Sequence, residues 1–178
     1  FNMSFAIFSD SSCNLPKAQL EEFQVQIISS SYEREGKLIT CPPYPEDFDG
    51  HEYYNFLRNK GVVKTSLIPA AQMEDAFRPV LAAGEDVLYI TLSSGISGTV
   101  ASGLQAAQAL MEEFPQRQVR VLDSMGAGFG IGLLLGRASD DRKAGLNLDQ
   151  TYASLERDRD NLCEFFTVDD LMFLRRTG

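Results

Sequence analysis

The sequence has only one histidine and three cysteines in 178 residues, and each scarcity argues against a class of function. Cys13, Cys41 and Cys163 lie far apart and form no CxxC pair, which argues against a disulfide framework or a zinc site. Three unpaired thiols are typical of a cytoplasmic protein. The single histidine, His51, leaves little scope for a serine nucleophile that needs a neighbouring base.

Positive charge and long apolar runs are scarce as well. Sixteen lysines and arginines face 25 aspartates and glutamates, for a net charge of −9. Nucleic-acid binding depends on Lys and Arg displacing counterions, so we expect no nucleic-acid partner. The longest weakly polar stretch, residues 125–136, falls short of the ~18 residues that a membrane span needs and is rich in glycine. We therefore expect a cytoplasmic protein with no signal peptide and no integral membrane association.

The chain does contain a regular alternation of strand-like and helix-like segments joined by short polar turns. We predict strands at residues 4–9, 25–31, 86–92 and 118–122, and helices at 17–23, 52–59, 72–83, 97–114 and 127–138. Residues 33–50, which contain three prolines, are predicted to form a loop. This alternation indicates an α/β fold: a three-layer α/β/α domain over residues 3–145, with a mostly parallel sheet.

The pattern changes after Gly145. A charged amphipathic helix is predicted at residues 148–162, a strand at 164–168 and a short helix at 169–176. We interpret residues 146–178 as the helix and first elements of an incomplete second α/β domain.

Small polar residues follow three of the predicted strands. These are Asp10-Ser11-Ser12, Ser93-Ser94-Gly95 and Asp123-Ser124. Because ligands of parallel α/β sheets bind beyond the carboxyl ends of the strands, we expect a site there. Asp10, Ser11 and Ser124 are predicted at its periphery.

The stretch from Ser93 to Thr99 has the strongest functional signal. It combines hydroxyls at Ser94, Ser97 and Thr99 with Gly95 and Gly98, directly before a predicted helix. A helix N-terminus presents free N–H groups and a positive dipole end, which suit an anion. The alternative is a tight turn with a helix cap, which needs only one hydroxyl.

Other patterns leave alternatives open. The segment Gly95-Ile96-Ser97-Gly98-Thr99 lacks the final glycine of a nucleophile elbow. The glycines of residues 126–136 match no nucleotide loop and favour tight helix packing. Asp10 and Asp123 can cap the helices that follow them, or can serve with a metal in an enzyme acting on a small anionic substrate. A purely structural or interaction domain is the third possibility.

Lys64-Thr65-Ser66 follows a short apolar pair, and locally it favours a helix start capped by one of the hydroxyls.

Five motifs, taken in order, resemble the DegV family of bacterial fatty-acid-binding proteins. IFSDSSCNLP (7–16) is similar to the family's TDSSxDLP, KTS (64–66) to its KTS, and TLSSGISGT (91–99) to its xxSSxxSGT. DS (123–124) and FTVDDLMFLRRTG (166–178) are similar to a later DS and to FTVDDLxxLxRGG. One departure is Leu67-Ile68-Pro69, where the family often has QPS.

The resemblance implies a two-domain, non-enzymatic carrier that binds one long-chain fatty acid and presents it to a separate fatty acid kinase. It implies no cofactor and no metal, and the fatty acid is the bound ligand. The family's head-group contacts carry over to Thr65 and Ser97, with Ser66, Ser94, Gly98 and Thr99 beside them. Arg175 and Arg176 are candidates for docking an acidic partner such as the kinase, or form a solvated helix end.

Overall fold

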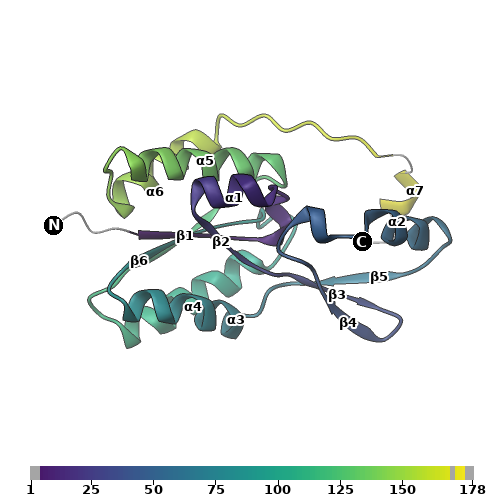
Figure 1. Ribbon diagram of the computed structural model, residues 1–178, viewed down its shortest axis with the longest axis horizontal. Coiled ribbons are helices and arrows are strands. Elements are labelled where there is room, and N and C mark those ends of the chain that lie inside the picture. The colour runs from purple at the N-terminus through teal and green to yellow at the C-terminus, as the bar shows by residue number, and fades with distance from the viewer. Residues whose placement is uncertain (1–4, 169–170, 175–178) are drawn as a thin grey trace.

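The computed structural model describes residues 5–168 and 171–174, and a parallel sheet lies at its centre (Figure 1). Its strand order is β2-β1-β6-β7, and every neighbouring pair is parallel. The strands are β1 (Phe5–Asp10), β2 (Val25–Ile28), β6 (Asp86–Thr91) and β7 (Val119–Asp123). The predicted α/β class with a parallel sheet is confirmed.

Helices cover both faces of this sheet, which gives three layers (Figure 1). On one face lie α1 (Lys17–Phe23), α5 (Phe129–Lys143) and α6 (Leu148–Arg159); on the other lie α3 (Ala70–Ala82) and α4 (Thr99–Glu113). The side chains of β1 explain why helices cover both faces, because successive residues of a strand point to opposite sides of the sheet. Phe5 and Ile7 join the core under α5, whereas Ala6 and Phe8 join the core over α3 and α4.

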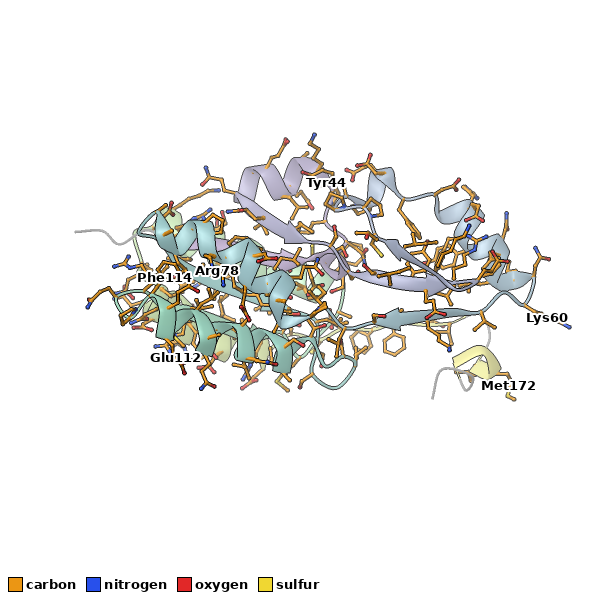
Figure 2. The ribbon with its side chains drawn as sticks, turned by 90° about the horizontal axis from the view of Figure 1, so that it is seen from below. Tyr44, Lys60, Arg78, Glu112, Phe114 and Met172 are labelled. Carbon is orange, nitrogen blue, oxygen red and sulfur yellow. The ribbon has the colours of Figure 1, made fainter. Side chains whose placement is uncertain are left out.

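Helices α3 and α4 lie side by side, as the view from below shows (Figure 2). Their apolar sides face the sheet, where Met73 and Phe77 of α3 are fully buried. On their outer side, Arg78 of α3 forms an ion pair with Glu113 of α4 at 3.1 Å.

Two glycines of α5 let it pack closely against Leu15 and α1, whereas a Cβ atom on the third, Gly130, would meet Glu164. A Cβ atom on Gly132 would lie 2.8 Å from Leu15, and one on Gly136 would lie 3.3 Å from Phe23. The larger residues Ile131 and Leu135 join the core that includes β1 and β6. The glycines therefore let α5 approach the segment of α1 closely while its apolar side covers the sheet.

A second, antiparallel sheet replaces the loop predicted for residues 33–50. Its order is β4-β3-β5, formed by β3 (Ser31–Arg34), β4 (Lys37–Thr40) and β5 (Val63–Ser66). Glu35 and Gly36 join β3 to β4 with φ values of 52° and 75°. Positive φ at both residues is the signature of a two-residue hairpin turn, so the loop prediction was wrong for the first half of this region.

Pairing with β3 also places Lys64-Thr65-Ser66 in a strand rather than at a helix start. Tyr32 pairs with Thr65 and Ser31 with Ser66. The short helix η2 (Pro45–Asp47) and α2 (Gly50–Arg58) follow the hairpin, and Asp49 caps α2 by accepting the N–H of Glu52.

The C-terminal part differs from its prediction in one element. Helix α6 packs its Leu148 and Leu155 into the same core as Phe5 and Ile7. Residues 162–168 are irregular and do not form the predicted strand; Phe165 and Phe166 are exposed there. The short helix α7 (Leu171–Leu174) follows. The division of the chain after Gly145 stays a prediction.

Two further points concern the ends and the membrane. Arg175 and Arg176 lie outside the described residues. Within residues 5–168 and 171–174, every helix is too short or too polar to span a bilayer.

Candidate functional site

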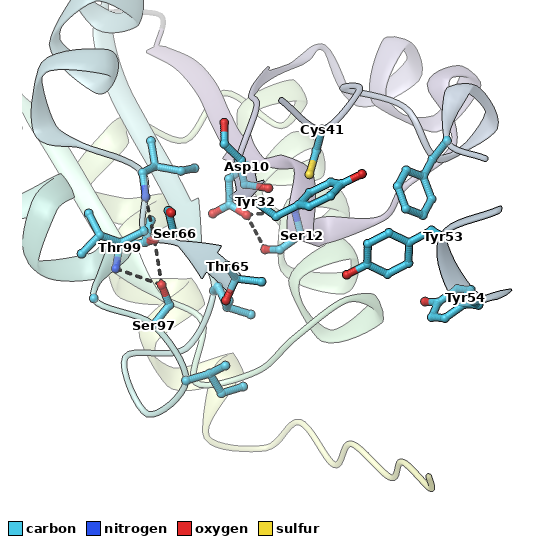
Figure 3. A pocket seen from close by; sticks show the side chains of 18 residues that line it. Asp10, Ser12, Tyr32, Cys41, Tyr53, Tyr54, Thr65, Ser66, Ser97 and Thr99 are labelled. Atoms are coloured by element: carbon cyan, nitrogen blue, oxygen red, sulfur yellow. Dashed lines mark hydrogen bonds between the residues drawn. The ribbon is translucent and has the colours of Figure 1, made fainter. Parts of the chain in front are cut away.

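A cavity of about 550 Å³ opens between the carboxyl end of the parallel sheet and the small antiparallel sheet (Figure 3). It is lined by the short helix η1 (Ser11–Cys13), strands β3 and β5, helix α2 and the loop before α4. Of the residues predicted to touch or border the ligand, the cavity brings together Asp10, Thr65, Ser66, Ser97, Gly98 and Thr99.

The Ser97 side of the cavity carries a connected set of hydrogen bonds. Helix α4 begins at Thr99, two residues later than predicted, with Gly98 as its N-cap. The N–H of Thr99 donates to Ser97 Oγ at 3.2 Å, and the two side-chain oxygens lie 2.9 Å apart. The N–H of Ile68 donates to Thr99 Oγ1 at 3.4 Å. These bonds tie the serine loop to the chain that follows β5.

Thr65 and Ser66 reach the same cavity because β5 pairs with β3. Both are exposed at the carboxyl end of β5, and both line the same cavity as Ser97 (Figure 3). The two motifs are separated by about thirty residues in sequence, so only the meeting of the two sheets places their hydroxyls in one cavity.

Asp10 lies at the buried side of the cavity with 2% of its surface exposed. Its Oδ2 accepts hydrogen bonds from Thr91 Oγ1 at 2.6 Å and from the Tyr89 hydroxyl at 3.2 Å. Its Oδ1 accepts from the N–H and the hydroxyl of Ser12. Asp10 thereby caps η1, as the capping interpretation expected. Burial, followed by the nearby Asp10 charge, raises the pKa of Tyr89 far above its usual range.

Three other predicted residues lie beside this cavity or away from it. Ser11 Oγ lies 2.7 Å from the hydroxyl of Ser30, which lines the cavity. Ser94 is exposed, and its N–H donates to Asp123 at 3.2 Å. Ser124 is buried and lines a smaller cavity of about 300 Å³ near Arg159.

Asp123 holds the turn after β7 and does not cap α5, whose N-cap is Gly128. Partial burial acts to raise the pKa of Asp123. Hydrogen bonds from Ser94 and from the Met125 N–H, with Arg159 nearby, outweigh it and leave the pKa lowered.

An aromatic wall on the far side of the cavity was missed by sequence reasoning. Tyr32, Phe48, Tyr53 and Tyr54 all line the cavity. The Tyr53 ring lies 5.3 Å from both the Tyr32 and the Tyr54 rings and 5.2 Å from Phe48. Burial raises the pKa values of Tyr32 and Tyr53, which keeps both phenols neutral. The only signal was the aromatic density of residues 48–54, which spans the end of the predicted loop and the start of the predicted helix at 52–59.

The described residues offer little to a metal. Across residues 5–168 and 171–174, no three His, Cys, Asp or Glu side chains gather where they could jointly hold an ion. Both oxygens of Asp10 already accept hydrogen bonds from protein donors.

Known proteins match this chain over nearly its whole length. A family model described as uncharacterised protein, DegV family, matches residues 4–178. A DegV domain-containing protein of Clostridium perfringens is 31% identical over 98% of this chain and 60% of its own length. This chain therefore spans about 60% of the length of that curated relative.

Solved structures show the same fold. A DegV family protein from Thermus thermophilus, described by its fatty acid binding, superimposes with a TM-score of 0.84 at 28% identity. That match covers 99% of this chain and 60% of the other. A stearic acid-binding protein from Eubacterium ventriosum matches with a TM-score of 0.76 at 26% identity, over 85% of this chain and 52% of the other.

Proposed function

Because this chain belongs to the DegV family, we propose that its cavity binds the carboxylate end of a long-chain fatty acid. The observation that carries the proposal is that Thr65 and Ser97 line one cavity together with apolar and aromatic side chains. In this proposal the protein acts in the cytoplasm as a carrier, without chemistry of its own, and presents the bound acid to a separate fatty acid kinase.

The head group would be held by neutral donors. A carboxylate is costly to remove from water unless hydrogen bonds replace its hydration. Hydroxyl groups and backbone N–H groups near a helix N-terminus can supply those bonds, and bonds to a charged acceptor are among the strongest in proteins. In the proposal, the cavity-lining Thr65, Ser66 and Ser97 take this role, and Gly98 lets the ligand approach the backbone.

The tail would supply most of the affinity. Each buried methylene contributes about 0.8 kcal/mol, so a tail of ~15 carbons offers about 12 kcal/mol before the cost of association. The described residues contribute apolar surface from Ile68, Leu92, Ile96 and the aromatic wall. A cavity of about 550 Å³ is within the usual size range of ligand sites.

The enzyme alternative, with Asp10, Asp123 and a metal, lacks a specific supporting observation. The carboxylate of Asp10 is committed to Ser12, Tyr89 and Thr91. The carboxylate of Asp123 holds the backbone of its own turn.

The proposal is tested with the purified 178-residue chain. Organic extraction followed by mass spectrometry should recover a long-chain fatty acid, or added palmitate should bind measurably by calorimetry. Ser97→Ala and Thr65→Val should each weaken palmitate binding about ten-fold, the value of one hydrogen bond to a charged group. Thr40→Val is the matched control, since Thr40 is exposed in β4 of the same small sheet. A chain that binds no fatty acid in either experiment would refute the proposal.

A further inference from the structure

We propose that Thr99 is a positioning residue that fixes Ser97 as a hydrogen-bond donor toward the ligand. The site would then select head groups that only accept hydrogen bonds, such as an ionised carboxylate, over groups that also donate. This inference rests on the proposed function, because it concerns the same cavity and the same ligand end.

The relevant chain of hydrogen bonds begins in the backbone. The N–H of Ile68 donates to Thr99 Oγ1 at 3.4 Å, and Thr99 Oγ1 lies 2.9 Å from Ser97 Oγ. The N–H of Thr99 also donates to Ser97 Oγ, at 3.2 Å. Thr99 is 4% exposed and Ser97 is half-buried, so Thr99 supports Ser97 from the protein side.

Counting protons and lone pairs gives the direction of the Ser97–Thr99 bond when a ligand is bound. A hydroxyl has one proton and can accept two hydrogen bonds. If Ser97 donated to Thr99, its proton would be used inside the pair and nothing would remain for a carboxylate. If Thr99 donates to Ser97, the Ser97 proton is free to point into the cavity. A bound carboxylate, which only accepts, selects the second arrangement.

In that arrangement Ser97 has no free acceptor site. Its two lone pairs receive the N–H and the O–H of Thr99. For an alcohol head group to donate to Ser97, the Ser97–Thr99 bond would have to reverse, and the proton of the buried Thr99 hydroxyl would lose Ser97 as its acceptor. A carboxylate finds a donor without that change. The two successive bonds from Ile68 through Thr99 to Ser97 also polarise each other, which strengthens the bond that Ser97 donates to an anion.

The test compares hexadecanoate with hexadecanol, which have the same number of carbons. Dissociation constants are measured for the unaltered chain, Thr99→Val and Thr99→Ser. Valine has the shape of threonine but no hydroxyl, so it frees a Ser97 lone pair and removes the polarising donor. We expect Thr99→Val to lower the preference for the acid over the alcohol about five-fold, and Thr99→Ser to preserve it.

A matched control separates positioning from a loss of packing. Thr151→Val is the same substitution at a fully buried threonine of α6, away from the cavity, and should leave the acid-to-alcohol ratio unchanged. Equal weakening of both ligands by Thr99→Val would show a structural role only and overturn the inference. The inference would also be overturned if Thr99→Val lowered the preference for the acid just as much in a Ser97→Ala background, where there is no serine to position.

Two outcomes distinguish this inference from the proposed function. If the unaltered chain binds neither ligand, the proposed function fails and the inference falls with it. If the chain binds hexadecanoate and its ratio does not respond to Thr99→Val, only the role of Thr99 is refuted. Should Thr99→Val fail to fold, the acid-to-alcohol ratio of Ser97→Ala is measured instead. If Ser97 acts only as a donor, Ser97→Ala must also lose preference for the acid, and an unchanged ratio would overturn the inference.

Discussion

Replacing Asp10 with alanine removes the acceptor on which four hydrogen bonds converge at the buried side of the cavity. The donors are the N–H and hydroxyl of Ser12, the hydroxyl of Thr91 at 2.6 Å and that of Tyr89 at 3.2 Å. Tyr89 and Thr91 are both 0% exposed, so water cannot replace the lost acceptor without opening the core. We expect Asp10→Ala to destabilise the whole domain and not only the cavity.

The magnitude follows from these contacts. Each buried donor left unpaired costs about 1–3 kcal/mol, and loss of the cap of η1 adds about 1 kcal/mol. Part of this is offset, because the buried carboxylate no longer has to be desolvated. A net loss of about 3 kcal/mol is expected, which is a large part of the 5–15 kcal/mol that is typical of a domain.

The assay is urea unfolding followed by circular dichroism. Asp10→Asn should lose less than Asp10→Ala, because its amide oxygen still accepts hydrogen bonds. The loss caused by Asp10→Ala should also shrink in a Tyr89→Phe background, where one of the stranded donors is gone. A loss below about 1 kcal/mol for Asp10→Ala, or equal losses in both backgrounds, would refute the reasoning.

Two further predictions concern packing and pH. Gly103→Leu should destabilise the domain by about 3 kcal/mol through overpacking, since even a Cβ atom there would lie 3.1 Å from Val121 and 3.3 Å from Tyr89. Thermal unfolding measures this loss, and an unchanged melting temperature would contradict the prediction. The lowered pKa of Asp123 stabilises the fold above the carboxyl's usual pKa near 4, and this contribution is lost as the pH falls through the folded-state pKa. Asp123→Asn should therefore be less stable than the unaltered chain at pH 7 and equally stable near pH 2; a difference that does not depend on pH would contradict the assignment.

The central sheet could be predicted because its signals are local. The strand predicted at residues 86–92 contains the apolar run 87–90, and all six residues of β6 are buried. A parallel strand covered by helices on both faces needs such a run, whatever its neighbours are. The helices between the strands were also recognised, with ends that differ by a few residues.

The small sheet could not be predicted in the same way. Strand β4 is mostly exposed, and in β5 Lys64, Thr65 and Ser66 are exposed. Such strands lack the apolar pattern that marks a buried one, and only pairing with β3 stabilises them. The error mattered for the site, because this sheet brings Tyr32 and Thr65 to the cavity.

The predicted strand at residues 164–168 failed for a related reason. Its sequence, EFFTV, has strand-forming residues, but a strand also needs a neighbour to complete its hydrogen bonds. In the structure this segment is irregular, and Phe165 and Phe166 are exposed.

The sequence by itself determined the residue types at the strand ends, which are hydroxyls and glycines, together with a single histidine and a net negative charge. It also determined the parallel core, because apolar runs and turn residues act over a few neighbouring positions. Only the tertiary structure decided that Thr65 and Ser97 line one cavity, that the Asp10 carboxylate accepts hydrogen bonds from three buried or half-buried residues, and that tyrosines line the far wall. Those relations depend on contacts between segments far apart in the chain, and no local spacing encodes them.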